Sequence, residues 1–211
     1  MIESNLKKYS KLKTLNVSRE TFPVLEEFRS LLIRENKKIN LISMSSEKDS
    51  INRHIIDSAQ IIDIIDKNSK NCIDLGSGSG LPGVVLAIIL KKKGSKIKFD
   101  LYEKSLKKSK FLNKMVKHFD LNAEVKQKNI FEEKGIEADI VVARAFKPFH
   151  IILELINKNF THFNKLILFL GKSGEKILKE CQKSWKFDHE VFRSLTEKNS
   201  IIVKIKDFKK K

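Results

Sequence analysis

The residue types most suited to chemistry lie in one glycine-rich turn, CIDLGSGSGLPG, at positions 72–83. A short apolar run carries Asp74 near its end, and Gly76, Gly78 and Gly80 then follow at alternate positions. Glycines in such a turn permit positive φ and let a ligand approach the main chain closely. Open parallel sheets bind ligands at the carboxyl ends of their strands. The turn is therefore expected to hold a ligand between a strand and the helix that follows it.

Two ligand classes compete for this turn. Residues 78–83 formally match the dinucleotide fingerprint G-x-G-x-x-G, but that fingerprint needs its first glycine directly after the strand, where Gly76 stands. The pattern acid-x-Gly-x-Gly-x-Gly fits with the correct placement and is typical of the S-adenosylmethionine loop of Rossmann-like methyltransferases. An acid near the sulfonium and amino groups of that cofactor is favourable, whereas it would repel a pyrophosphate. We expect S-adenosylmethionine, and the turn residues assigned to it are Asp74, Gly76, Ser77, Gly78 and Gly80.

A carboxylate at the end of the next strand supports an adenosine ligand. The run KFDLYE ends in Glu103, and a carboxylate there can accept both ribose hydroxyls. NAD-binding proteins use an acid at the same place, so Glu103 indicates adenosine without deciding between the two cofactors.

Elements that can position these residues follow from the apolar pattern after residue 70. Short apolar runs alternate with helical segments, which predicts a parallel sheet covered on both faces. The last two runs have no helix between them and are expected to form an antiparallel hairpin at one edge. The fold class is α/β: a Rossmann-like, doubly wound, mostly parallel seven-stranded sheet. The expected strands are 72–75, 97–102, 123–128, 139–144, 165–170, 187–192 and 200–205, and the expected helices are 82–93, 105–119, 148–160 and 174–185.

Before residue 70 the pattern is helical. Apolar residues recur at helical spacing from Phe22 to Leu32, and a second helical stretch is expected over residues 47–66, capped by Ser45 or Ser46. We therefore expect two parts, an N-terminal helical extension over residues 1–68 and a methyltransferase-like domain over residues 69–211.

Composition narrows the class of partner. The chain of 211 residues carries 43 Lys+Arg against 26 Asp+Glu, a net charge of +17, yet only six of the basic residues are arginine. A positive electrostatic field of this strength favours encounters with a polyanion such as RNA, although the general abundance of lysine explains part of the net charge. Two cysteines build neither a disulfide framework nor a zinc site, and the histidines lack metal-ligand spacing. Because no run is apolar enough to span a bilayer, we expect a cytoplasmic protein without membrane or metal.

Four motifs, in order, resemble one family closely. They are KINLIS (38–43), RHIIDS (53–58), DLGSGSGLPG (74–83) and VARAF (142–146). Together they resemble the bacterial 16S ribosomal RNA guanine-N7 methyltransferases of the G type, over roughly residues 25–206. The resemblance implies 16S rRNA of the small ribosomal subunit as partner and a lysine after the fifth strand, here Lys172. The cofactor contacts that it implies are Gly76, Leu81, Ile130, Phe131 and Arg144.

The implied reaction needs no general base. Guanine N7 has an accessible lone pair and no proton at neutral pH, so it can attack the sulfonium methyl directly once it is held in line. We therefore expect no catalytic acid or base. Arg144 is expected to hydrogen-bond the guanine or a phosphate, to hold the cofactor carboxylate, or to form an ion pair with Asp57 or Asp74.

RNA contacts are expected from basic residues beside the cofactor turn. A lysine-rich helix start follows Glu103, and its lysines either bind phosphate or are simply solvated. His54 is expected to bridge the two parts by a hydrogen bond and can also line the RNA cleft. The RNA-binding candidates are Arg53, His54, Lys104, Lys107, Lys108, Lys110 and Lys172.

Three other functions remain open from sequence. The same fold could methylate a small molecule or a protein, or the chain could be a basic RNA-binding module that has lost activity. The intact glycine turn, Glu103 and Arg144 argue against that loss. A dehydrogenase is disfavoured by the glycine placement. Nothing in the sequence demands more than a monomer.

Overall fold

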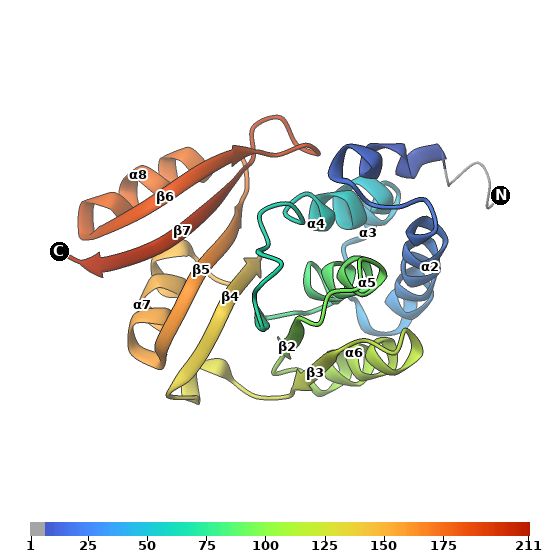
Figure 1. Ribbon diagram of the computed structural model, residues 1–211, viewed down its shortest axis with the longest axis horizontal. Coiled ribbons are helices and arrows are strands. Elements are labelled where there is room, and N and C mark those ends of the chain that lie inside the picture. The colour runs from blue at the N-terminus through green and yellow to red at the C-terminus, as the bar shows by residue number, and fades with distance from the viewer. Residues whose placement is uncertain (1–6) are drawn as a thin grey trace.

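A single seven-stranded sheet organises the chain, and the computed structural model describes residues 7–211 of it (Figure 1). The strand order is β3-β2-β1-β4-β5-β7-β6, with parallel pairing from β3 to β5. The last two strands form an antiparallel hairpin, and β7 joins it to β5. This confirms the predicted fold class. The strands are β1 (Asn71–Leu75), β2 (Lys98–Tyr102), β3 (Ala123–Lys126), β4 (Ile136–Arg144), β5 (Phe160–Leu170), β6 (Trp185–Arg193) and β7 (Ile201–Lys210).

Alternate residues of the strands feed two hydrophobic clusters, one on each face of the sheet. In β4, Ile140 and Val142 belong to one cluster and Val141 and Ala143 to the other. The period of two residues explains why these runs are continuously apolar, since both faces are covered. The first face carries α5 (Gly83–Lys92) and α6 (Leu106–His118), and the second carries α7 (Phe149–Asn159) and α8 (Gly174–Ser184) (Figure 1).

The N-terminal segment is helical, as predicted, and packs on the α5–α6 face. Leu25, Phe28 and Leu32 of its longest helix share a buried cluster with α5 and α6. The boundary predicted at residue 68 falls just before β1 and stays a prediction. None of the helices within residues 7–211 has the length and apolar character that a membrane span requires. The N-terminal elements are η1 (Tyr9–Leu15), α2 (Thr21–Ile39), α3 (Met44–Glu47), η2 (Ile51–Ile56) and α4 (Asp57–Ala59).

The single helix predicted over residues 47–66 is wrong in two respects. The segment is divided into α3, a π-helical turn η2 and the short α4, followed by turns. Its cap is neither Ser45 nor Ser46 but Ser43, whose side chain accepts a hydrogen bond from the Ser46 N–H. An apolar pattern cannot separate α from π turns over so short a stretch, because the two differ in which backbone groups are hydrogen-bonded and a single π turn does not establish a period of its own.

One buried amide attaches the loop after β3 to the second layer of helices. Asn159, the last residue of α7, is buried, and its Nδ2 donates to the carbonyls of Phe131 (3.0 Å) and Glu133. These bonds hold the 3₁₀ turn η3 (Ile130–Glu132), which carries the predicted cofactor contacts Ile130 and Phe131, against α7.

Asn159→Ala is expected to lower the free energy of unfolding by about 1–3 kcal/mol, because the partly buried carbonyls of the turn lose the donor that the buried amide supplies. Asn157→Ala makes the same change at an exposed position of the same helix and is expected to stay within about 0.5 kcal/mol of wild type. Urea denaturation of both variants measures the difference. Equal losses in the two variants would contradict a role for the buried amide.

Candidate active site

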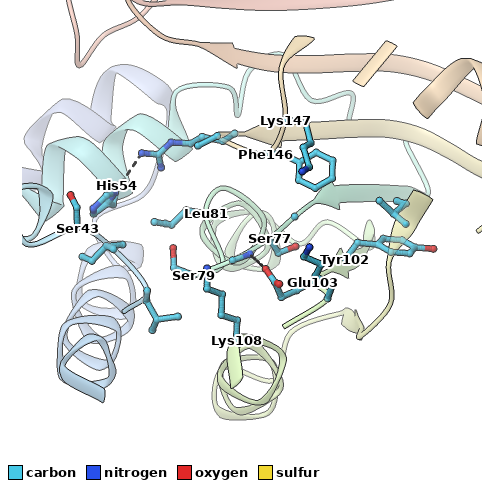
Figure 2. Close-up of a pocket in the computed structure, with 18 of the residues that line it drawn as sticks. Ser43, His54, Ser77, Ser79, Leu81, Tyr102, Glu103, Lys108, Phe146 and Lys147 are labelled. Carbon is cyan, nitrogen blue, oxygen red and sulfur yellow. Dashed lines mark hydrogen bonds between the residues drawn. The ribbon is translucent and has the colours of Figure 1, made fainter. Parts of the chain in front are cut away.

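One cavity of about 670 Å³ lies at the carboxyl ends of β1, β2 and β4 (Figure 2). This volume is within the range of small-ligand sites, and the position is the one expected for an open parallel sheet. Six parts of the chain line it: the glycine turn, the ends of β2 and β4, the first turn of α6, the turn after β3 and the N-terminal segment. Its lining residues include Leu41, Ile42, Ser43, Ser46, Arg53, His54, Gly76, Ser77, Gly78, Ser79, Leu81, Tyr102, Glu103, Lys104, Lys108, Lys128, Asn129, Ile130, Phe131, Arg144, Ala145, Phe146 and Lys147.

The glycine turn has the backbone conformation that its sequence predicts. Gly76, Gly78 and Gly80 have φ of +69°, +55° and +83°. At Gly76 a Cβ atom would lie 2.2 Å from a ring carbon of Phe146, so the ring occupies the space that a side chain would need. Gly80 is equally restricted, because its Cβ would meet the Val84 side chain at 2.6 Å. The turn is therefore compact, with bare backbone at the cavity wall.

Asp74 lies beneath this turn and not among the lining residues. The residue is 1% exposed, and its Oδ2 accepts a hydrogen bond from the Gly83 N–H at 3.1 Å. Oδ1 has no hydrogen-bond partner within residues 7–211. Burial raises the pKa of Asp74 to about 7, against the bonds from Ser77 and Gly83 that lower it. Asp74 thus supports the helix start from below, and its assignment as a cofactor contact stays a prediction.

Glu103 joins the glycine turn to the second strand. Its Oε2 accepts from the Gly78 N–H at 3.0 Å (Figure 2). Its Oε1 accepts from the Ser105 N–H at 2.7 Å. Each carboxylate oxygen can accept a second hydrogen bond. Glu103 therefore combines a fixed orientation with free acceptor capacity at the cavity, as a ribose contact requires.

The Arg144 guanidinium is directed at the N-terminal segment, and all three of its nitrogens are engaged there. Nε lies 2.9 Å from Asp57 Oδ2, and Nη1 donates to Ser58 Oγ at 3.3 Å. Nη2 donates to the Arg53 carbonyl at 2.5 Å and to His54 Nδ1 at 3.4 Å. Of the ion pairs considered from sequence, the structure contains the one with Asp57. The guanidinium thus connects the end of β4 to η2 and α4.

His54 is held as a neutral imidazole. Because an arginine only donates, His54 Nδ1 accepts from Arg144, and Nε2–H donates to Ser46 Oγ at 3.0 Å. Burial, followed by the charges of Arg144 and Arg53, lowers the pKa of His54 to about 4. Both ring nitrogens are occupied, so His54 bridges elements and has no free nitrogen to act as a base.

The predicted RNA-binding lysines are divided by the structure. Lys104 and Lys108 line the cavity, whereas Lys107 and Lys110 are exposed on α6 outside its lining. Lys172 is in the turn after β5, outside the cavity lining, with Nζ 3.7 Å from Glu197. No group of three or more His, Cys, Asp or Glu within residues 7–211 could hold a metal ion.

Several lining residues were not identified from sequence. Their positions depend on how the N-terminal segment and the loop after β4 fold over the turn. The motifs KINLIS and VARAF contain several of them, so the sequence marked these segments as family motifs but did not indicate that they line the site. These residues are Leu41, Ile42, Ser43, Ser46, Ser79, Tyr102, Lys128, Asn129, Ala145, Phe146 and Lys147.

The family model and the related sequences that match this chain carry the same family name. Residues 22–203 match the family model described as rRNA small subunit methyltransferase G. The chain is 46% identical to Ribosomal RNA small subunit methyltransferase G of Pelagibacter ubique (strain HTCC1062), over all of both chains. It is 35% identical to the protein of that name from Rickettsia bellii (strain OSU 85-389), covering 93% of this chain and 98% of that one.

Solved structures share the fold. The O-methyltransferase from Bacillus cereus in complex with SAH has a TM-score of 0.59 at 14% identity, covering 98% of this chain and 100% of that one. TrmK of M. capricolum in complex with S-adenosyl-homocysteine has a TM-score of 0.52 at 18% identity, covering 71% of this chain and 66% of that one. At these identities the likeness concerns the fold alone.

Gly76→Ala is expected to weaken binding of the predicted cofactor S-adenosylmethionine more than tenfold, because the added methyl meets the Phe146 ring and one side or the other must shift. Gly94→Ala is the matched control. Gly94 has a similar φ of +73°, with nothing within 4 Å of its Cβ position, so it carries the same backbone strain without the contact. Isothermal titration calorimetry compares the two. Equal affinities would mean that the turn does not form the cofactor site.

The buried His54 is expected to make stability depend on pH. Its pKa is near 6.5 in the unfolded chain and about 4 in the folded one, so the unfolded state binds more protons between these values. Stability is therefore lost as pH falls from 6.5 to 4, by up to about 3 kcal/mol from this group. His54→Gln is expected to reduce this dependence, and His150→Gln, at an exposed position, to leave it unchanged. Urea denaturation from pH 7.5 to 4.5 measures the free energy of unfolding at each pH. If that free energy falls with pH as steeply in His54→Gln as in wild type, the pH dependence does not come from His54.

Proposed function

This chain belongs to the rRNA small subunit methyltransferase G family, and from that premise we propose that it transfers the methyl group of S-adenosylmethionine to N7 of one guanine in 16S rRNA. The observation that carries the proposal is that one cavity is lined by the glycine turn, by Glu103 and by the basic residues Lys104, Lys108 and Arg53. One space thus adjoins both a nucleoside-type cofactor site and a surface for RNA.

The cofactor end of the cavity fits S-adenosylmethionine. Gly76 offers bare backbone where a Cβ has no room, as close approach of an amino-acid tail requires. Glu103 has acceptor capacity for the ribose hydroxyls, and Ile130 with Phe131 offers an apolar wall for adenine. When bound, the cofactor supplies a methyl group activated by the sulfonium. The proposed cofactor contacts are the predicted residues that line the cavity: Gly76, Ser77, Gly78, Leu81, Glu103, Ile130 and Phe131. Of the other predicted contacts, Asp74 and Gly80 lie outside the lining and support the turn, and Arg144 is assigned to the cavity wall.

The guanine N7 carries its own lone pair and no proton, so the protein has only to hold N7 in line with the sulfonium methyl and to exclude water. His54 is consistent with a reaction that needs no base, because both of its ring nitrogens are hydrogen-bonded, to Arg144 and to Ser46. Arg144 likewise directs its guanidinium to Asp57 and its neighbours and acts by orienting the walls of the cavity. No acid or base is assigned.

RNA binding is attributed to the basic residues around the cavity. Lys104 and Lys108 line it and are the principal phosphate contacts proposed; Arg53 and His54 line it from the N-terminal side. Lys107, Lys110 and Lys172 lie outside the lining and are proposed for more distant phosphates. The small ribosomal subunit is the proposed partner, in the cytoplasm, with the protein acting as a monomer.

The test is transfer of labelled methyl from S-adenosylmethionine to small subunits that lack the modification and to protein-free 16S rRNA, followed by mapping of the modified base. Label on one guanine N7 is expected, and comparison of the two substrates identifies the form recognised. Gly76→Asp, which places a charged side chain in the Phe146 ring space, serves as the inactive control. If wild type binds cofactor and labels neither RNA, the ribosomal assignment is wrong and methylation of a small molecule or protein takes its place.

A further inference from the structure

The cavity has two chemically different ends. Figure 2 shows Tyr102, Glu103 and Phe146 toward one side and Ser43 and His54 toward the other, with Leu81 between them. The first end has the carboxylate and bare backbone that suit a nucleoside with an amino-acid tail. The second end is built by residues 41–43 together with Ser46, Arg53 and His54, all from the N-terminal segment. A ligand at the first end leaves the second for the group that receives the methyl.

Residues 41–43, which link α2 to α3, form the wall of the second end and are here named the base wall. Buried Asn36 anchors this wall from below. Its Oδ1 accepts from the N–H groups of Leu41 (2.7 Å) and Ile42 (2.8 Å), and its Nδ2 donates to Glu47 Oε2 (2.8 Å). One side chain thus fixes two consecutive peptide groups outside any helix. Such a wall is rigid before substrate arrives, which favours precise positioning.

A second anchor reaches the base wall from the sheet. Arg144 Nη2 donates to His54 Nδ1, and His54 Nε2–H donates to Ser46 Oγ at 3.0 Å. Ser46 Oγ in turn donates to the Ser43 carbonyl at 2.8 Å and accepts from Ser43 Oγ at 2.9 Å. This hydrogen-bond chain is continuous from the end of β4 to the base wall. His54 and Ser46 are buried, so the bond between them is shielded from water and costly to lose, and the other bonds of the chain are partly buried.

We propose that the base wall seats the target purine of the RNA, and that Arg144 positions this wall through His54 and Ser46. The inference rests on the proposed function and deepens it. Leu41 and Ile42 offer apolar surface suited to the flat face of an unstacked base, which enzymes that modify nucleobases require. Arg144 is in this scheme a positioning residue, because its guanidinium contacts the N-terminal segment and acts on the base through other side chains.

The base wall is tested with Ile42, which belongs to it, and with Ile39, the last residue of α2. Ile42 and Ile39 are both half-buried and packed on the same hydrophobic cluster, but only Ile42 lines the cavity. Ile42→Ala is expected to lower kcat/KM for small subunits about tenfold or more, equivalent to about 1.4 kcal/mol, while the Kd for S-adenosylmethionine changes less than about twofold. Ile39→Ala is expected to match wild type in both. Equal effects of the two substitutions, or a Kd that rises with the loss of rate, would overturn the base wall.

The hydrogen-bond chain is tested by a double-mutant cycle of Arg144→Lys and Ser46→Ala, with thermal unfolding measured in parallel. Each variant is expected to lower kcat/KM for small subunits about tenfold with the cofactor Kd unchanged, and the double variant to lose no more than the worse single one. If the loss of kcat/KM in the double variant equals the product of the two single losses, the residues act independently and the proposed hydrogen-bond chain is overturned. A tenfold weaker Kd in Arg144→Lys would instead make Arg144 a cofactor contact.

Failure of the inference is distinct from failure of the proposed function. Wild-type protein is measured in the same assay, and its transfer to N7 tests the proposed function alone. Active wild type with unaffected Ile42→Ala and Ser46→Ala variants would overturn the inference and leave the function intact. Inactive wild type would overturn both.

Discussion

The ion pair between Arg144 and Asp57 is the interaction on which the shape of the site depends. Nε and Oδ2 lie 2.9 Å apart, and both side chains are mostly shielded from water. Asp57 also accepts from Thr196 Oγ1 (2.6 Å) and from Gln60 Nε2 (2.8 Å), so one carboxylate joins the sheet, the N-terminal segment and the loop between β6 and β7. A shielded pair of this kind is maintained by complete hydrogen bonding, since either charge alone would be costly to bury.

This arrangement uses charge to fix geometry. A parallel sheet by itself provides one wall, at the carboxyl ends of its strands, and the helices that precede β1 supply the opposite wall. Arg144, at the end of β4, is bonded to the N-terminal segment and so joins the two walls. The neutral His54 then continues the connection into the N-terminal segment, and the carboxylate of Glu103 fixes the glycine turn on the other side. A reaction whose nucleophile needs no deprotonation requires only that the cavity walls position the reactants, without a dedicated acid or base.

The sequence predicted the parts of the molecule that depend on local pattern. Strand–helix alternation, the edge hairpin and the glycine turn all follow from apolar spacing and from the residues that tolerate positive φ. Features set by distant partners did not follow. Apolar spacing gives no sign that η2 is a π turn or that Ser43 caps α3. Asp74 shows the same limit, because its position below the turn depends on how tightly Gly83 packs over it. Arg144 had several possible partners in the sequence, and tertiary packing selects Asp57.

The most direct test of a cavity with a cofactor end and a base end is a crystal structure of the protein with S-adenosylhomocysteine. The expected complex has adenine against Ile130 and Phe131 and the ribose hydroxyls on Glu103. The sulfur is expected to point toward Leu81, with residues 41–43 and His54 left free of ligand. A ligand seated against residues 41–43, or one that leaves Glu103 without a ribose contact, would contradict the division of the cavity.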